Sequence, residues 1–209
     1  MKVNKKLMGL TTIICLLPMF LGITLYEALP DMIPSQWGFS GEISSYMSKN
    51  SMVFYMPVFM AFCNLVVHAA FHVDPKRANQ SETLKKITAF IVPVLSMIFI
   101  PLSYLAGLGV NINIVPIAML IVGVVFMLIG NYMPKCRQNY TMGIRVPWTL
   151  NSEENWNRTH RMAGKLWTVA GIIIIMSTWF DMYYIIIPVM VVIVGVPFIY
   201  SYMLYRKGI

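Results

Sequence analysis

The chain has 209 residues, of which 58% are hydrophobic and 11% charged, and its formal net charge is +8. Soluble domains carry about 45–50% apolar and about 25% charged residues, so this composition excludes a soluble globular enzyme, a disordered tail and a disulfide-stapled secreted module. A membrane-crossing helix needs about 20 apolar residues, so the chain has room for six spans with short loops.

Runs without charge predict the spans in chain order. The first run, 7–26, follows three lysines and has no small-residue cleavage site after it, which predicts an uncleaved helix. The run 87–134 is too long for one span, and the turn-forming sequence GLGVNIN at 107–113 divides it into two. The other predicted spans are 51–73, 166–180 with an extension to about 183, and 182–205.

These runs predict an all-α membrane protein with six transmembrane helices, because backbone groups in hydrocarbon must be hydrogen-bonded within their own segment. We expect one integrated membrane domain. Residues 1–73 supply the first two spans with the outer segment, and residues 74–209 supply a four-span region.

The basic residues predict the orientation. With a cytoplasmic N-terminus, fifteen of the sixteen Lys and Arg residues lie inside, and only Lys49 lies outside. Because inner loops carry the excess of basic residues, we expect both termini inside. The same asymmetry explains the net charge, which therefore indicates membrane lipids as partners rather than direct contact with nucleic acid.

Two connecting segments are longer than the topology needs, and their aromatic, Pro and Gly content predicts ordered structure. The outer segment is 29–50 and the inner segment is 133–165. The stretch GNYMPKCRQNYTMGIRVPWTLNSEENWNRTHRMAGKLW at 130–167 resembles the signature of the SdpI family of bacterial membrane proteins. The outer stretch LPDMIPSQWGFSGE is similar to the LPxxIPxHW-type domain of that family, with Gln36 where many relatives carry His.

The resemblance implies a multi-pass protein of the bacterial cell membrane that is not an enzyme. It implies immunity to a secreted membrane-active antimicrobial peptide, met outside the cell. It also implies signalling, in which a cytoplasmic repressor protein is held at the membrane by the inner segment.

The outer segment has two interpretations. It is either a lid that rests its tryptophan at the lipid headgroups or a docking surface for a hydrophobic peptide, since aromatic side chains are frequent hot spots in such contacts. Two prolines stiffen it and glycine permits a tight turn. The peptide-docking candidates are Pro30, Pro34, Trp37 and Gly41.

In the inner segment, Asn151 and Glu154 have the spacing of a capping box that begins an amphipathic helix at the inner surface, and this helix leads into the fifth span. Its aromatic and basic residues predict either lipid anchoring or the binding of an acidic protein partner or lipid group. The candidates for partner or lipid binding are Asn139, Gly143, Arg145, Pro147, Trp148, Trp156, Arg158, His160 and Arg161.

The sequence contains few residues that could bind a metal or catalyse a reaction. His68 and His72 have a spacing that can ligate a metal, but too few further ligands accompany them, so we expect no metal and no cofactor. No catalytic residue is predicted, because paired intramembrane carboxylates and known catalytic motifs are lacking. The alternative function is a small membrane transporter or an intramembrane enzyme acting on a peptide or lipid; the absence of charges at the middle of the spans weighs against it.

Overall fold

The computed structural model describes residues 5–209. Lys2, which contributes to the predicted charge asymmetry, lies outside the described residues, as does the side chain of Arg77. Within the described part, six helices are long and apolar enough to cross a membrane, as the sequence predicts. Their ranges are Lys5–Thr24, Ser51–Val73, Glu82–Gly107, Ile114–Lys135, Glu153–Phe180 and Tyr183–Arg206.

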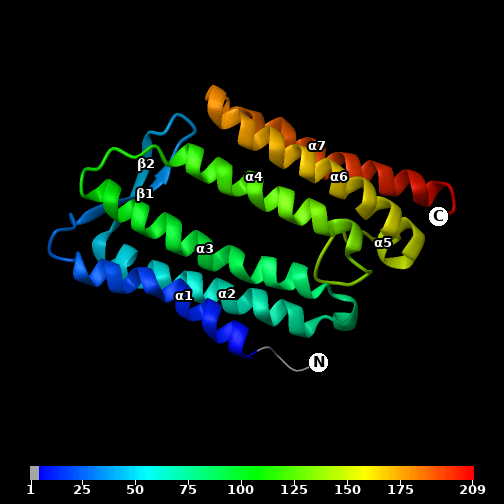
Figure 1. Ribbon diagram of the computed structural model, residues 1–209, viewed down its shortest axis with the longest axis horizontal. Helices are drawn as coiled ribbons and strands as arrows, with labels where there is room; N and C mark the ends of the chain where they lie inside the picture. The colour runs from blue at the N-terminus through cyan, green and yellow to red at the C-terminus, as the bar shows by residue number, and fades with distance from the viewer. Residues whose placement is uncertain (1–4) are drawn as a thin grey trace. The chain divides into compact units, whose positions relative to one another are not determined.

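The elements follow one another along the chain as Figure 1 labels them. The helices are α1 (Lys5–Thr24), α2 (Met56–Val73), α3 (Glu82–Gly107), α4 (Ile114–Tyr132), α5 (Pro147–Asn151), α6 (Glu153–Ser177) and α7 (Ile186–Arg206). A π-helical turn, Ser51–Tyr55, precedes α2. The strands are β1 (Met32–Trp37) and β2 (Ile43–Ser48).

The two strands correct the all-α prediction. They pair antiparallel within residues 29–50, which we call the hairpin segment, with a register irregularity after Pro34. Proline lacks an N–H and is tolerated here because each strand of a two-stranded sheet is an edge. The pairing places Ile33 opposite Met47, and both pack into the apolar core of their unit.

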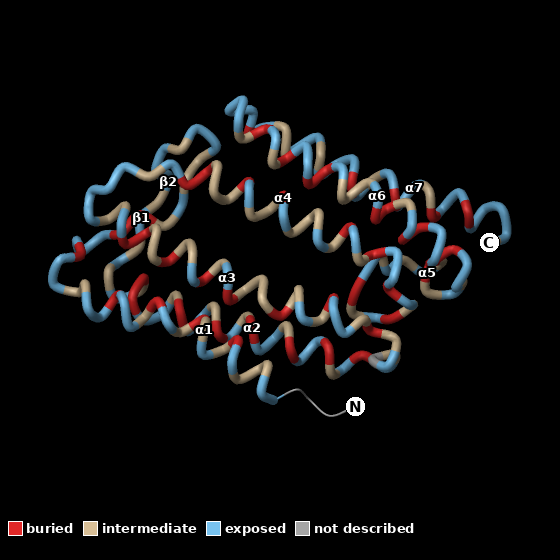
Figure 2. Tube along the Cα trace, in the orientation of Figure 1, coloured by how far each residue is buried: buried red, intermediate tan, exposed pale blue. Residues whose placement is uncertain are grey.

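The chain forms two compact units that are interleaved in sequence. Among the described residues, unit 1 comprises 5–69 and 88–115, and unit 2 comprises 70–87 and 116–209. Each contains several membrane-length helices. Figure 2 shows exposed residues along α7 in unit 2, as expected for a helix whose apolar surface faces lipid.

Polar side chains join the three helices of unit 1. The Ser96 hydroxyl of α3 donates to the Cys15 carbonyl of α1 at 2.9 Å, and the Tyr104 hydroxyl donates to the Pro18 carbonyl at 3.3 Å. Between α1 and α2, the Thr11 hydroxyl oxygen lies 3.0 Å from both the Asn64 amide and the His68 ring. Buried polar groups in a membrane are stable only when paired, so these contacts fix the helix order.

Glycines bring α4 and α6 into close contact within unit 2. A Cβ atom on Gly171 would lie 2.5 Å from the Gly123 carbonyl, and one on Gly164 would lie 2.6 Å from the Gly130 carbonyl. The glycines are seven residues apart on both antiparallel helices, so one face of each helix is free of side chains at two successive levels. Such small residues let helix backbones approach each other in lipid.

Helix α6 corrects one detail of the predicted inner segment, the residue that caps its first turn. Its N-cap is Ser152, whose hydroxyl accepts from the Asn155 N–H at 3.2 Å, whereas Asn151 is the last residue of α5. The predicted amphipathic helix is the first part of α6, which continues without a break to Ser177 and so leads into the fifth span as expected.

Candidate functional site

Unit 2 carries an ordered loop with many polar contacts, residues 136–152, which we call the polar loop. Asn139 organises its first turn from a fully buried position. Its side-chain oxygen accepts from the N–H groups of Thr141 at 3.0 Å and Met142 at 2.7 Å, and its amide donates to the Arg137 carbonyl at 2.8 Å and to the Cys136 sulfur at 3.3 Å. A side chain that bonds four neighbours in this way substitutes for regular secondary structure.

Two buried rings of α6 contact the polar loop and hold it in place. The Trp156 indole donates to the Cys136 carbonyl at 2.7 Å, and its ring stacks on His160 with centroids 3.9 Å apart. The Ile144 N–H donates to Nε2 of His160 at 2.9 Å, so Nδ1 carries the proton and donates to the Trp156 carbonyl at 2.8 Å. A Cβ atom at Gly143, where φ is +103°, would lie 2.3 Å from the His160 Nε2 atom.

The α5 helix connects the polar loop to α7. Pro147 occupies the first turn of α5, where its missing N–H has no cost. The half-buried Trp148 indole donates to the Ser201 hydroxyl at 2.8 Å. The same indole lies 5.4–5.9 Å, centroid to centroid, from three rings of α7: Phe198, Tyr202 and Tyr205.

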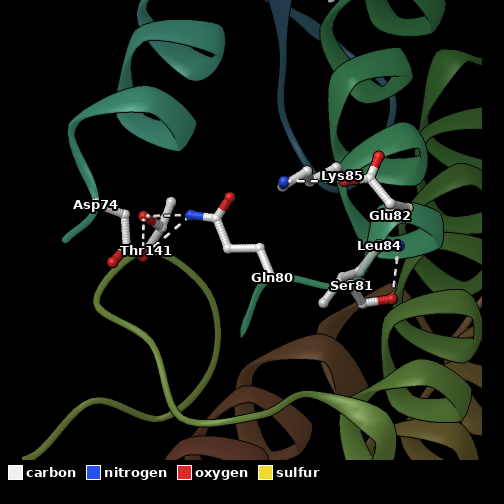
Figure 3. Close-up of polar contacts among 7 residues, drawn as sticks. All are labelled: Asp74, Gln80, Ser81, Glu82, Leu84, Lys85 and Thr141. Atoms are coloured by element: carbon white, nitrogen blue, oxygen red, sulfur yellow. Dashed lines mark hydrogen bonds and ion pairs between the residues drawn. The ribbon is translucent and has the colours of Figure 1, made fainter. Parts of the chain in front are cut away.

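The connection between α2 and α3 is attached to the polar loop through Asp74, a residue that the sequence analysis did not assign to the site (Figure 3). Its carboxylate accepts four hydrogen bonds. The donors are the Lys76 N–H at 2.8 Å, the Gln80 amide at 3.0 Å, the Tyr140 N–H at 3.0 Å and the Thr141 hydroxyl at 2.7 Å. Two of these donors belong to the polar loop, so one buried carboxylate holds the two segments together.

These bonds also set the charge of Asp74. Burial by itself raises the pKa of this carboxyl group, but the bonds from Thr141, Gln80 and the two backbone N–H groups outweigh it and hold the pKa below its usual value. Asp74 is therefore a carboxylate at neutral pH, and its charge strengthens each bond that it accepts.

Gln138 forms a second attachment next to Asp74. Its side-chain oxygen accepts from the Lys76 ammonium group at 2.6 Å, and its carbonyl accepts from the Asn79 amide at 2.9 Å. Its own amide donates to the carbonyls of Thr149 and Leu150 at 2.8 Å each. Gln138 thereby ties the α2–α3 connection to the polar loop and, within that loop, holds the first turn against the α5 helix.

The predicted arginines lie on the surface of unit 2. Arg145 is exposed and donates to the Tyr140 carbonyl. Arg158 forms an ion pair with Glu154 at 2.5 Å, one turn away, and both side chains are about half exposed. Arg161 is exposed one turn further along α6. Among the inner candidates, Asn139, Trp156 and His160 are thus buried and hold the loop, whereas the three arginines are exposed and available to a ligand.

The hairpin segment in unit 1 brings together the four outer candidates. Pro30 is exposed, Pro34 is buried and Trp37 is half-buried. Gly41 occupies the turn with a φ of +86°, where a Cβ atom would lie 3.1 Å from the Asn113 side-chain oxygen. The hairpin therefore rests its tip on the connection between α3 and α4.

Large apolar side chains are exposed on the hairpin segment, among polar ones. Met32 is 54% exposed, Tyr46 is 52% exposed, and Phe39 and Ile43 are each 40% exposed. Beside the turn, a hydrogen bond from the Ser40 hydroxyl holds the pKa of the exposed Glu42 carboxyl below its usual value. The structure therefore combines a small apolar surface with a single carboxylate at the hairpin turn.

The six membrane-length helices define a multi-pass membrane protein, and the comparisons with known proteins specify its class. A model of the SdpI/YfhL protein family matches residues 135–201, which include the polar loop and α6. A second model, a domain of unknown function (DUF1648), matches residues 13–61, which include the hairpin segment.

Immunity protein SdpI of Bacillus subtilis (strain 168) is 32% identical over 203 residues, and the match covers 95% of each chain. The chain belongs to the SdpI family and is a multi-pass protein of the bacterial cell membrane. No solved structure matches it.

Proposed function

We propose that this protein makes its cell immune to a secreted, membrane-active antimicrobial peptide, and that it does so without catalysing a reaction. The observation that carries the proposal is the match to an immunity protein over 95% of both chains, because it includes both the hairpin segment and the polar loop. A membrane protein has direct access to the place where such a peptide acts.

The hairpin segment is the proposed docking surface for the peptide. Its exposed methionine, isoleucine and aromatic side chains suit a hydrophobic ligand, and the half-buried Trp37 supplies a rigid anchor. The proposal includes the predicted orientation, which places this segment outside the cell, where a secreted peptide arrives.

Replacing the immunity gene of B. subtilis with the gene for this chain tests the proposal, with survival measured in co-culture with toxin-producing cells. Cells that express the chain should survive, and cells with an empty locus should not. Survival equal to that of the empty locus, with the chain present in the membrane, would refute the immunity proposal.

A matched pair of tryptophan variants tests the docking surface. Trp37→Ala should lower survival, because it removes the anchor of the hairpin segment. Trp179→Ala should not, although Trp179 is 73% exposed and follows α6, outside that segment. Equal survival of the two variants at equal membrane abundance would rule out Trp37 as an anchor.

We also propose that the exposed cations of unit 2 hold a cytoplasmic repressor protein at the membrane. Arg158 supports this role because its guanidinium is exposed and can pair with a carboxylate of a partner. Arg158→Gln should reduce membrane recruitment of the repressor. Glu154→Gln is the control: it breaks the same ion pair but keeps the cation, so recruitment should persist. Equal loss in both variants would contradict a cationic docking face.

A further inference from the structure

A groove runs along α6 and α7 in unit 2 and has a volume of about 1000 Å³. One end is lined by charged side chains of α6 and the other by apolar side chains of α6, and Tyr200 of α7 also lines the groove, near the charged end. The charged residues are Glu153, Glu154, Arg158, Arg161 and Lys165, and the apolar ones of α6 are Met162, Leu166 and Val169. A phospholipid molecule has the same arrangement, with a charged headgroup at one end and hydrocarbon chains at the other.

The charges at the groove favour an anion. Three cations face two carboxylates, and Glu154 is already paired with Arg158. Within the described part of the chain, Arg161 and Lys165 form no ion pair, and both are exposed. Two unpaired cations one turn apart on a helix can bind a single phosphate group.

The dimensions also fit a lipid. The helix that begins at Glu153 extends over 28 residues to Phe180, about 42 Å, whereas the hydrocarbon layer is about 30 Å thick. Its charged first turns therefore reach the headgroup level. From Arg158 to Val169 the groove follows eleven residues, about 16 Å, which is close to the depth of one leaflet.

We infer that this groove binds an anionic phospholipid, with the phosphate at Arg161 and Lys165 and an acyl chain along Leu166 and Val169. The residues of this lipid site are different from those of the hairpin segment, the docking surface proposed for the peptide. A soluble acidic protein would pair with the cations but would leave the apolar end of the groove exposed.

The test is native mass spectrometry of the full chain in detergent, titrated with phosphatidylglycerol or phosphatidylcholine. The wild-type chain should retain phosphatidylglycerol in preference. Arg161→Gln combined with Lys165→Gln should weaken that retention about 25-fold, since each cation near a headgroup is worth about fivefold. The matched control is Arg206→Gln combined with Lys207→Gln, which removes the same charges outside the groove and should retain the lipid like the wild type.

The Val169→Trp variant distinguishes binding of the lipid in the groove from binding of its headgroup to a charged surface alone. The larger ring fills the apolar end and leaves every charge in place, so it should also weaken phosphatidylglycerol retention. Thermal unfolding of each variant in detergent verifies that the chain is folded. Equal retention of the two lipids, equal effects of the two double variants, or normal retention by Val169→Trp would each overturn the inference. Unchanged lipid retention with lost repressor recruitment in the first double variant would assign the cations to the protein partner instead.

Discussion

The hairpin segment and the polar loop are held in place by different interactions. The polar loop is held by buried side chains that form several hydrogen bonds each, such as Asn139 within the loop and Asp74 in the α2–α3 connection, and most of their partners are backbone groups. The hairpin segment depends on a backbone ladder and on one apolar face that includes Ile33. Residues of the polar loop are therefore needed for its shape, whereas exposed side chains of the hairpin segment such as Met32 lie where a ligand can contact them.

The largest effect should come from Gly143→Ala. The new methyl group would lie 2.3 Å from the His160 ring at a φ of +103°, so it combines a clash with backbone strain. We expect a loss of about 4 kcal/mol in unfolding free energy. Gly109→Ala is the control, because Gly109 has a φ of +87° with no atom within 4 Å and should lose about 1 kcal/mol. Thermal unfolding in detergent measures both, and equal losses would mean that the rings do not fix the loop.

A smaller effect should come from Asp74→Asn. An amide cannot accept all four hydrogen bonds, and the lost charge weakens those that remain, so we expect a cost of about 2–3 kcal/mol at neutral pH. The pKa of Asp74 is lower in the folded chain than its usual value. Its stabilisation is therefore complete above the usual pKa of about 4 and is lost as the pH falls through the folded-state pKa.

The difference in melting temperature between the wild type and Asp74→Asn should accordingly shrink as the pH is lowered from about 6 to about 3. A difference that stays constant over this range would show that Asp74 does not act as a carboxylate. Limited proteolysis of residues 74–81 and of the polar loop should show both segments loosened together in the variant.

The smallest effect should come from Tyr46→Ser in the hairpin segment. The side chain of Tyr46 is exposed and forms no hydrogen bond within the described residues, so the unfolding free energy should change by less than about 0.5 kcal/mol. Survival against toxin should nevertheless fall if this surface binds the peptide. A stability loss comparable to that of Asp74→Asn would remove the contrast between the two segments.

Much of the fold could be predicted from the sequence because membrane spans are local signals. Charge-free runs and the turn at 107–113 predict the six helices, and the spacing of Trp156 and His160 correctly places both on one face of a helix. The N-cap prediction missed by one residue, since Asn151 and Ser152 are both good caps and only the geometry distinguishes them.

The features of the fold and of the site that could not be predicted depend on contacts between residues far apart in the sequence. The bonds from Asp74 reach the polar loop 66 and 67 positions away, and no sequence spacing indicates them. The strands were missed because a proline inside a short, weakly alternating segment weighs against strand formation. The sequence also does not show that Trp156 and His160 are buried. Residues that hold the loop were therefore grouped with residues able to contact a partner.

The central claim is that the hairpin segment faces the outside of the cell and the polar loop faces the cytoplasm. Cysteine labelling with a membrane-impermeant maleimide tests it most directly, with Ser44→Cys in the hairpin segment and Asn151→Cys in the polar loop, both at exposed positions. The unmodified chain, whose three cysteines are buried or half-buried, gives the background. We expect Ser44→Cys to label in intact cells and Asn151→Cys only after permeabilisation. Labelling of Asn151→Cys in intact cells would contradict the account.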